Sequence, residues 1–222
     1  MASAGECAWA QKSIPKPKIN KSSSTTTTST SSKKTSTTSR ATGTIAGHDY
    51  VDLGLSVKWA TCNIGASCPE DYGDHYAWGE TSTKSSYDND NCETWDTSTD
   101  DIGGTSRDVA HVKWGGSWRM PTEAEFEELM NTANCTWTWT TQGGHKGYKV
   151  TSKKNGNSIF LPAAGFRYGA SLDNREEVGR YWSSTPDESN TRYACYLYFD
   201  SGYRCPNWSR RYHGHAVRPV AE

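Results

Sequence analysis

The residue types best suited to chemistry gather near the C-terminus, in residues 203–213. These residues include three arginines, two tyrosines, one tryptophan and one histidine, with no aliphatic side chain. A segment this polar and aromatic cannot be buried throughout, so much of it must lie at the surface. Tyr, Trp and Arg give binding surfaces rigid contact area, cation–π stacking and forked hydrogen bonds. The composition therefore favours a ligand-binding surface over an ordinary edge strand with a few packed rings.

Three other groups of residues have types used in metal binding or catalysis. His213 and His215 could offer two imidazoles to a metal ion, but no acid lies nearby in sequence, so we predict surface histidines and no metal site. Residues 88–93 have the composition of a calcium loop yet lack the glycine and distant Glu of an EF-hand, which indicates a solvated acidic loop. Residues 71–80 contain Asp, Glu and His suited to acid–base chemistry, but nothing in the sequence places them together.

The seven cysteines are irregularly spaced and form no CxxC pair, so a structural zinc site is not expected. Cys62 and Cys68 could close a small loop in an oxidising compartment. Free and mostly buried thiols are the favoured interpretation.

The N-terminal part of the chain differs sharply in composition from the rest. Residues 22–39 are all Ser or Thr except Lys33 and Lys34, so they cannot bury enough apolar surface to fold. Up to His48 there are seven basic residues against Glu6, a balance of +6, which leaves −7 for the rest of a chain whose net charge is −1. We predict a disordered basic tail and linker over residues 1–47 and one domain over residues 48–222. The lysines are scattered without interleaved aromatics, so nucleic-acid binding is not expected.

Membrane insertion is also not expected. No segment has the apolar length of a membrane span, and the first ten residues lack the apolar run of a secretory signal.

The elements that would position the C-terminal segment belong to an α+β fold with small antiparallel sheets, one or two helices and much loop. Thr122 and Glu125 form a capping box that predicts a helix of about three turns, with Phe126, Leu129, Met130 and Ala133 on one face. Residues 136–140 alternate strictly between Thr and Trp, which predicts a strand. Residues 147–152 and 158–162 flank an Asn-Gly turn, which predicts a hairpin. An opening pair of short strands is expected within residues 50–61, with a turn near Gly54.

The last predicted hairpin carries the polar segment. It joins residues 193–199 to the following strand around residues 200–202. Alternation puts Leu197 and Phe199 on the core face, and Tyr198 should then point outward. The core itself should consist of large rings, and we assign to it Trp59, Trp78, Trp118, Trp137, Trp139 and Trp182.

Five separated motifs follow one another along the domain. They are YVDLGLSVKWAT at residues 50–61, GGSWRMPT at 115–122, LPAAG at 161–165, YWSST at 181–185 and GHAVRPV at 214–220. Their order resembles the bacterial major paralogous domain family, often abbreviated FISUMP. That family is similar in turn to proteins with a C-type lectin fold, which include formylglycine-generating enzymes and the variable proteins of diversity-generating retroelements. The resemblance implies a C-type lectin-like fold, a ligand-binding function, and a location on a cell surface or a phage particle.

In the retroelement-diversified relatives, the corresponding C-terminal segment is varied by substitutions at adenines of Asn-type codons. Such codons do not yield Lys, Gln, Met, Glu or Trp, and residues 187–215 contain only Glu188 and Trp208 from that group. We therefore predict a set of varied or ligand-facing positions. They are Asp187, Asn190, Arg192, Tyr193, Cys195, Tyr198, Tyr203, Cys205, Asn207, Ser209, Tyr212 and His213.

Two alternatives remain open. One is a carbohydrate-binding module, in which exposed aromatics stack on sugar rings. The other is a copper oxidase of the formylglycine-generating type, which needs two closely spaced cysteines for a soft metal ion. Cys195 and Cys205 are ten residues apart, on opposite arms of the predicted hairpin, so neither enzyme activity nor a cofactor is expected. The expected partner is a protein or glycan on a surface.

The diversification hypothesis is testable in the coding DNA. We expect a nearby near-repeat of the region encoding residues 187–215 that differs from it only at adenines, together with a reverse transcriptase gene. Sequencing the locus and its flanks checks this. A near-repeat without adenine-specific differences, or none at all, would remove diversification from the interpretation.

Overall fold

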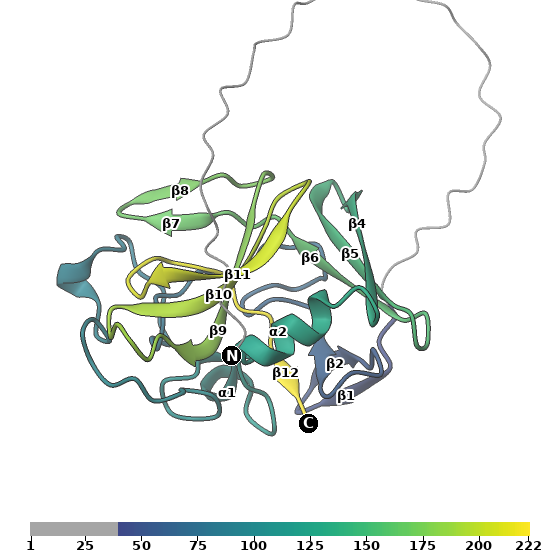
Figure 1. Cartoon of the computed structure of the whole chain (residues 1–222), viewed down its shortest axis with the longest axis horizontal. Helices are drawn as coiled ribbons and strands as arrows, with labels where there is room; N and C mark the ends of the chain where they lie inside the picture. The colour runs from purple at the N-terminus through teal and green to yellow at the C-terminus, as the bar shows by residue number, and fades with distance from the viewer. Residues whose placement is uncertain (1–39) are drawn as a thin grey trace, which may run out of the picture. The chain divides into compact units, whose positions relative to one another are not determined.

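The computed structural model describes residues 40–222, so the predicted tail lies outside the described residues up to residue 39. The first strand, β1 (Gly43–Ile45), pairs antiparallel with β2 (His48–Val51). Ordered backbone therefore precedes the boundary predicted at His48. Figure 1 shows the described chain as several small sheets joined by long loops, with two α-helices, which confirms the α+β class.

The first and last parts of the described chain share one sheet. Its strand order is β1-β2-β3-β12, with β3 at Lys58–Ala60 and β12 at Val220–Ala221. Trp59 lies opposite Val220, and both side chains are fully buried. The strand pair predicted within residues 50–61 is present as β2 and β3, although β2 begins earlier, at His48. The C-terminal strand β12 pairs with the other edge of β3.

The central sheet has the order β11-β10-β9 and contains the predicted C-terminal hairpin. The three strands are β9 (Gly179–Pro186), β10 (Tyr193–Phe199) and β11 (Arg204–Arg210). Leu197 and Phe199 are buried in the main core, as predicted. The opposite face is covered too, because Tyr196 packs into a second cluster and Tyr198 is half-buried against it. The prediction that Tyr198 points outward is therefore only partly correct.

Two further antiparallel sheets complete the β-structure. The order β4-β5-β6 joins Cys135–Gln142, His145–Ser152 and Ser158–Pro162, and it includes the hairpin predicted around Asn155 and Gly156. Gly156 has φ +77°, which suits glycine in that turn. The smaller sheet pairs β7 (Phe166–Tyr168) with β8 (Ser171–Asp173).

The helices are short. They are η1 (Asn89–Asn91), α1 (Val109–Trp114) and α2 (Glu123–Met130). The Thr122–Glu125 capping box is present, but α2 ends at Met130, so it is shorter than predicted and exposed Ala133 lies beyond it. Asn131 explains the early end, because its side chain accepts the Ala133 N–H at 2.9 Å and turns the chain toward β4.

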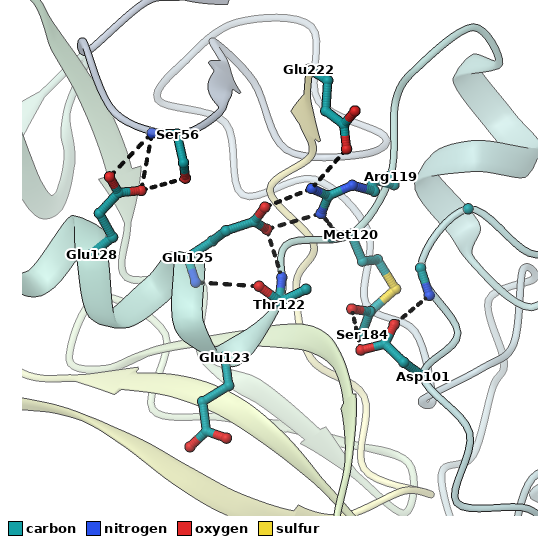
Figure 2. A network of polar contacts seen from close by, with 12 residues as sticks. Ser56, Asp101, Arg119, Met120, Thr122, Glu123, Glu125, Glu128, Ser184 and Glu222 are labelled. Carbon is teal, nitrogen blue, oxygen red and sulfur yellow. Dashed lines mark hydrogen bonds and ion pairs between the residues drawn. The ribbon is translucent and has the colours of Figure 1, made fainter.

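An ion pair joins the start of α2 to the chain around it (Figure 2). The guanidinium of Arg119 donates to both carboxylate oxygens of Glu125 at 2.6 and 2.9 Å, and Glu125 also accepts the backbone N–H of Thr122 at 2.8 Å. At the other end of the helix, the backbone N–H of Ser56 donates to Glu128 at 3.1 Å. These bonds hold α2 against segments that precede it, and Arg119 also pairs with Glu222 at the end of the chain at 3.7 Å.

The predicted core tryptophans are mostly buried. Trp59, Trp78, Trp118 and Trp182 are buried, whereas Trp137 and Trp139 are half-buried against the main core. Within residues 40–222, no helix has the length and apolar character needed to cross a membrane.

Arg218 is fully buried between the first strands, β6 and the C-terminal segment. Its guanidinium donates to Asn63 Oδ1 at 2.8 Å, to the Phe160 carbonyl at 3.0 Å and to the Ala60 carbonyl at 3.2 Å. Burial lowers the pKa of Arg218 from its ordinary value. All three partners are uncharged oxygens, so the side chain acts as a hydrogen-bonding hub rather than as half of an ion pair.

Replacing this hub should destabilise the fold. In Arg218→Met no charge is buried, but three oxygens lose their donor, so we expect the free energy of unfolding to fall by about 2 kcal/mol. Urea unfolding measures this, with Arg107→Met at an exposed position as the control, expected within about 0.5 kcal/mol of the parent. Equal stability of the two variants would contradict the role given to Arg218.

Candidate functional site

A surface pocket of about 350 Å³ lies between the acidic loop near η1 and the C-terminal hairpin. Its lining residues are Asn89, Trp95, Asn190, Arg192, Tyr193, Arg210 and Tyr212. Four of them, Asn190, Arg192, Tyr193 and Tyr212, belong to the set predicted from the sequence. We call this site the aromatic–cationic pocket.

Aromatic rings form one wall of the aromatic–cationic pocket. The ring centroids of Trp95 and Tyr212 are 5.2 Å apart, and the ring of Tyr168 is 6.2 Å from that of Tyr212. Tyr168 is 54% exposed, so the aromatic surface continues outside the pocket. Tyr212 is only 5% exposed, so the apolar area open to a ligand comes mainly from Trp95 and Tyr168, with the Tyr212 phenol behind them.

Two exposed arginines supply the charge. Arg192 lies 5.5 Å from the centroid of the Trp95 ring and pairs with Asp96 at 3.1 Å. Arg210 instead donates to the hydroxyl groups of Tyr212, at 2.8 Å, and Tyr193, at 3.4 Å. Arg210 makes no ion pair with a carboxylate of residues 40–222, so the pocket has a net positive charge.

A buried arginine holds the two sides of the pocket together. Arg211 is 0% exposed, lies 4.2 Å from the Trp78 ring centroid, and donates to the carbonyls of Tyr193 at 3.2 Å and Ser98 at 2.9 Å. It also reaches the Thr94 carbonyl at 3.3 Å, whereas its Nη2 is buried without a partner. Burial lowers the pKa of Arg211 to about 10, so the group stays charged at pH 7. This one side chain fixes the Trp95 loop against β10.

Two neutral histidines follow Tyr212 in the chain, and the ring of His213 meets that of Tyr212 edge-on with centroids 4.7 Å apart. Ser209 Oγ lies 2.9 Å from His213 Nδ1 and 3.3 Å from His215 Nε2. Burial, followed by the charges of Arg180 and Arg210, lowers the pKa of His213 to about 4, and burial lowers the pKa of His215 well below its ordinary value. His215 stacks on Trp182 at 4.0 Å and is fully buried, so the prediction of a surface histidine is wrong there. The reason is that the ring of Trp182 covers one face of the imidazole while the ring of Tyr196 meets it edge-on at 4.7 Å.

The remaining predicted site residues are divided by burial. Asp187, Tyr198, Asn207 and His213 are half-buried and Tyr203 is exposed, so they stay accessible. Cys195, Cys205 and Ser209 are buried at 1%, 8% and 5% exposure. These three side chains are therefore not accessible to a ligand, contrary to the prediction. β10 is covered on both faces, and Cys205 and Ser209 lie on the covered face of β11, whose other face carries exposed Trp208 and Arg210.

The cysteine pair does not suit a soft metal ion. Cys195 lies opposite Trp208 and Cys205 lies opposite Tyr198, so the two thiols project to opposite faces of the sheet. Burial, followed by the charge of Glu123, raises the pKa of the Cys195 thiol, which therefore stays protonated at pH 7. Cys62, Cys68, Cys92, Cys135 and Cys195 are free thiols. No cluster of three or more metal-ligating side chains occurs within residues 40–222.

Sequence reasoning missed Trp95, Asn89 and Arg210. Arg210 lies within residues 203–213, but Asn89 and Trp95 are more than a hundred residues earlier. Asn89 belongs to residues 88–93, interpreted as a solvated acidic loop, and Trp95 follows that loop. A large ring in an otherwise polar loop was the available signal.

Comparison with known proteins gives one family match. A family model described as a domain of unknown function, DUF8237, matches residues 145–220, which is less than half of the 222-residue chain. The matched part includes the C-terminal hairpin and its arginines. No curated protein and no solved structure matches significantly.

The Arg211 anchor can be tested directly. In Arg211→Met the apolar stem still packs on Trp78 but donates no hydrogen bonds, so we expect the free energy of unfolding to fall by about 2 kcal/mol. Amide hydrogen exchange over residues 94–98 should also accelerate, because the loop loses its anchor. Exposed Arg210→Met is the matched control, and faster exchange in both variants alike would contradict the anchoring role.

Proposed function

We propose that residues 40–222 form a ligand-binding module whose recognition site is the aromatic–cationic pocket. The observation that carries this proposal is the convergence of two distant segments: Trp95 and Tyr212 stand 5.2 Å apart beside two exposed arginines around an open cavity. A buried arginine fixes both segments before any ligand arrives. A rigid site of this kind loses little entropy on binding.

The favoured ligand is a protein on a cell surface that presents an acidic group. Tyr, Trp and Arg dominate the energetics of protein recognition sites. Asp96 already neutralises Arg192, whereas the side chain of Arg210 bonds only to phenols among the residues that the structure describes. A ligand carboxylate can pair with Arg210 in a forked geometry while an apolar part lies on Trp95.

The resemblance to C-type-lectin-fold variable proteins supports diversification of this surface. The described elements have the α+β class that this resemblance implies. Four residues, Asn190, Arg192, Tyr193 and Tyr212, both line the pocket and have types reachable from Asn-type codons. We take these four, with accessible Asp187, Tyr198, Tyr203, Asn207 and His213, as the varied positions. Such a module belongs on a cell surface or a phage particle.

A carbohydrate ligand is the second candidate. Asn89 and Asn190 bring side-chain amides to the same pocket as the Trp95 ring. Stacking on a ring with amides at its edge is the arrangement that sugar-binding sites use. We do not propose oxidase activity, because Cys195 and Cys205 face opposite sides of their sheet.

Binding arrays separate these candidates. The chain is probed against bacterial surface proteins and against glycans, and the strongest ligand is then titrated with Trp95→Ala and Arg210→Gln. We expect a protein ligand, and each variant should weaken its binding at least about tenfold, as for hot-spot residues.

Trp208→Ala is the matched control, because Trp208 is 41% exposed but outside the pocket. It should bind within about twofold of the parent, with circular dichroism confirming that all variants fold. Equal losses in Trp208→Ala and Trp95→Ala would place the site elsewhere. Binding confined to the glycans would favour the second candidate.

A further inference from the structure

A second cavity, of about 200 Å³, shares no lining residue with the aromatic–cationic pocket. Its lining residues are Gly73, Asp74, His75, Thr83, Lys84, Tyr87, Arg167 and Arg175. We call it the polar cavity. It brings together part of the acid- and histidine-containing segment at residues 71–80, whose members the sequence alone could not place.

The inner wall of the polar cavity is fixed and uncharged. Tyr87 and His75 are 1% and 4% exposed, and the Tyr87 hydroxyl donates to the His75 carbonyl at 2.5 Å. His75 Nε2 lies 3.1 Å from the Ala164 carbonyl and therefore carries the ring hydrogen. Burial lowers the pKa of His75 to about 4, so the ring is neutral at pH 7.

Two arginines of the rim have no carboxylate partner. The ammonium of Lys84 pairs with Glu80 at 2.6 Å, so its charge is already compensated. Arg167 and Arg175 form no ion pair with any carboxylate of the described residues, and both guanidinium charges act on His75. Asp74 is the single carboxylate that lines the cavity, and its Oδ2 accepts the Tyr76 hydroxyl at 3.0 Å. Apart from the Lys84–Glu80 pair, the lining of the polar cavity therefore carries two positive charges and one negative charge.

The surrounding structure fixes the backbone of one arginine and contacts the guanidinium of the other. The backbone of Arg167 in β7 exchanges hydrogen bonds with Gly214 at 2.7 and 2.9 Å. The guanidinium of Arg175 lies 4.7 Å from the ring centroid of Tyr72, which covers one of its faces and leaves the edge donors available. Neither guanidinium donates a hydrogen bond within the described residues, and guanidinium groups with unused donors are suited to oxyanions.

We propose that the polar cavity binds a compact tetrahedral oxyanion, either phosphate or sulfate, through Arg167 and Arg175. Its volume of about 200 Å³ is below the range typical of sites for drug-sized ligands, which suits a single oxyanion group. The group is either a free ion or an ester on a larger molecule that extends out of the cavity. This site does not depend on the function proposed for the aromatic–cationic pocket.

Titration calorimetry tests the proposal on the full chain. Inorganic phosphate, inorganic sulfate and glucose 6-phosphate are titrated separately at constant ionic strength set with chloride, which keeps nonspecific screening equal. We expect saturable binding with one site per chain. Arg167→Gln combined with Arg175→Gln should weaken it at least about tenfold, whereas Arg107→Gln, at an exposed position outside the cavity, should bind as the parent does.

Stronger binding of the ester than of the free ions would identify an oxyanion carried on a larger molecule, and the reverse would identify a free ion. The absence of saturable binding to the parent would overturn the proposal. So would unchanged binding by the double variant, with circular dichroism showing that it folds. The single variant Arg175→Gln, at an exposed position, gives a second measurement if the double variant is unstable.

Discussion

The fold depends on a charged side chain that is buried without a counter-charge. Arg218 lies in the centre of the domain, where a guanidinium is costly to desolvate unless every donor has a good acceptor. Its acceptors are two carbonyls and one amide oxygen from segments that are otherwise far apart in sequence. Asn63 extends the connection, since its amide nitrogen donates to the Tyr72 carbonyl and to the Tyr181 hydroxyl. The C-terminal segment can occupy the core only if all of these loops are in place, so a single residue couples their positions.

The aromatic–cationic pocket also depends on a buried arginine that is hydrogen-bonded to backbone carbonyls. Arg211 is a buried guanidinium that is satisfied mainly by loop carbonyls, and the loop it fixes carries Trp95. Loops of this length have few backbone partners of their own, and an arginine with five donors can satisfy several carbonyls at once. Regular structure is therefore not needed to make the pocket rigid. The exposed positions around it can change identity without disturbing the anchor, which is what a surface adapted to different ligands needs.

Local sequence signals predicted the local elements well. The Thr122–Glu125 capping box, the Asn-Gly hairpin and the alternation around Leu197 all correspond to observed elements, because each depends on neighbours within a few residues.

The errors concern contacts between distant segments. Cys195 and His215 look accessible in sequence, yet α2 and the Trp182 layer bury them. Trp95 could not be assigned to the site because nothing near it in sequence indicates Tyr212 as its neighbour. The polar cavity was missed for the same reason, since Arg167 and His75 meet only after β7 pairs with the C-terminal segment.

The pairing of β3 with β12 sets an order of events during synthesis. The strand that contains Trp59 is made early, but its partner Val220 emerges from the ribosome only after nearly all of the described chain. Until then the first sheet lacks one edge, and Arg218 is not yet available to Asn63. The core therefore cannot close before β12 has emerged, and the tryptophan-rich surfaces of the domain stay uncovered in the nascent chain until then. At that stage the nascent chain presents apolar surface and an unpaired strand edge, both of which promote aggregation.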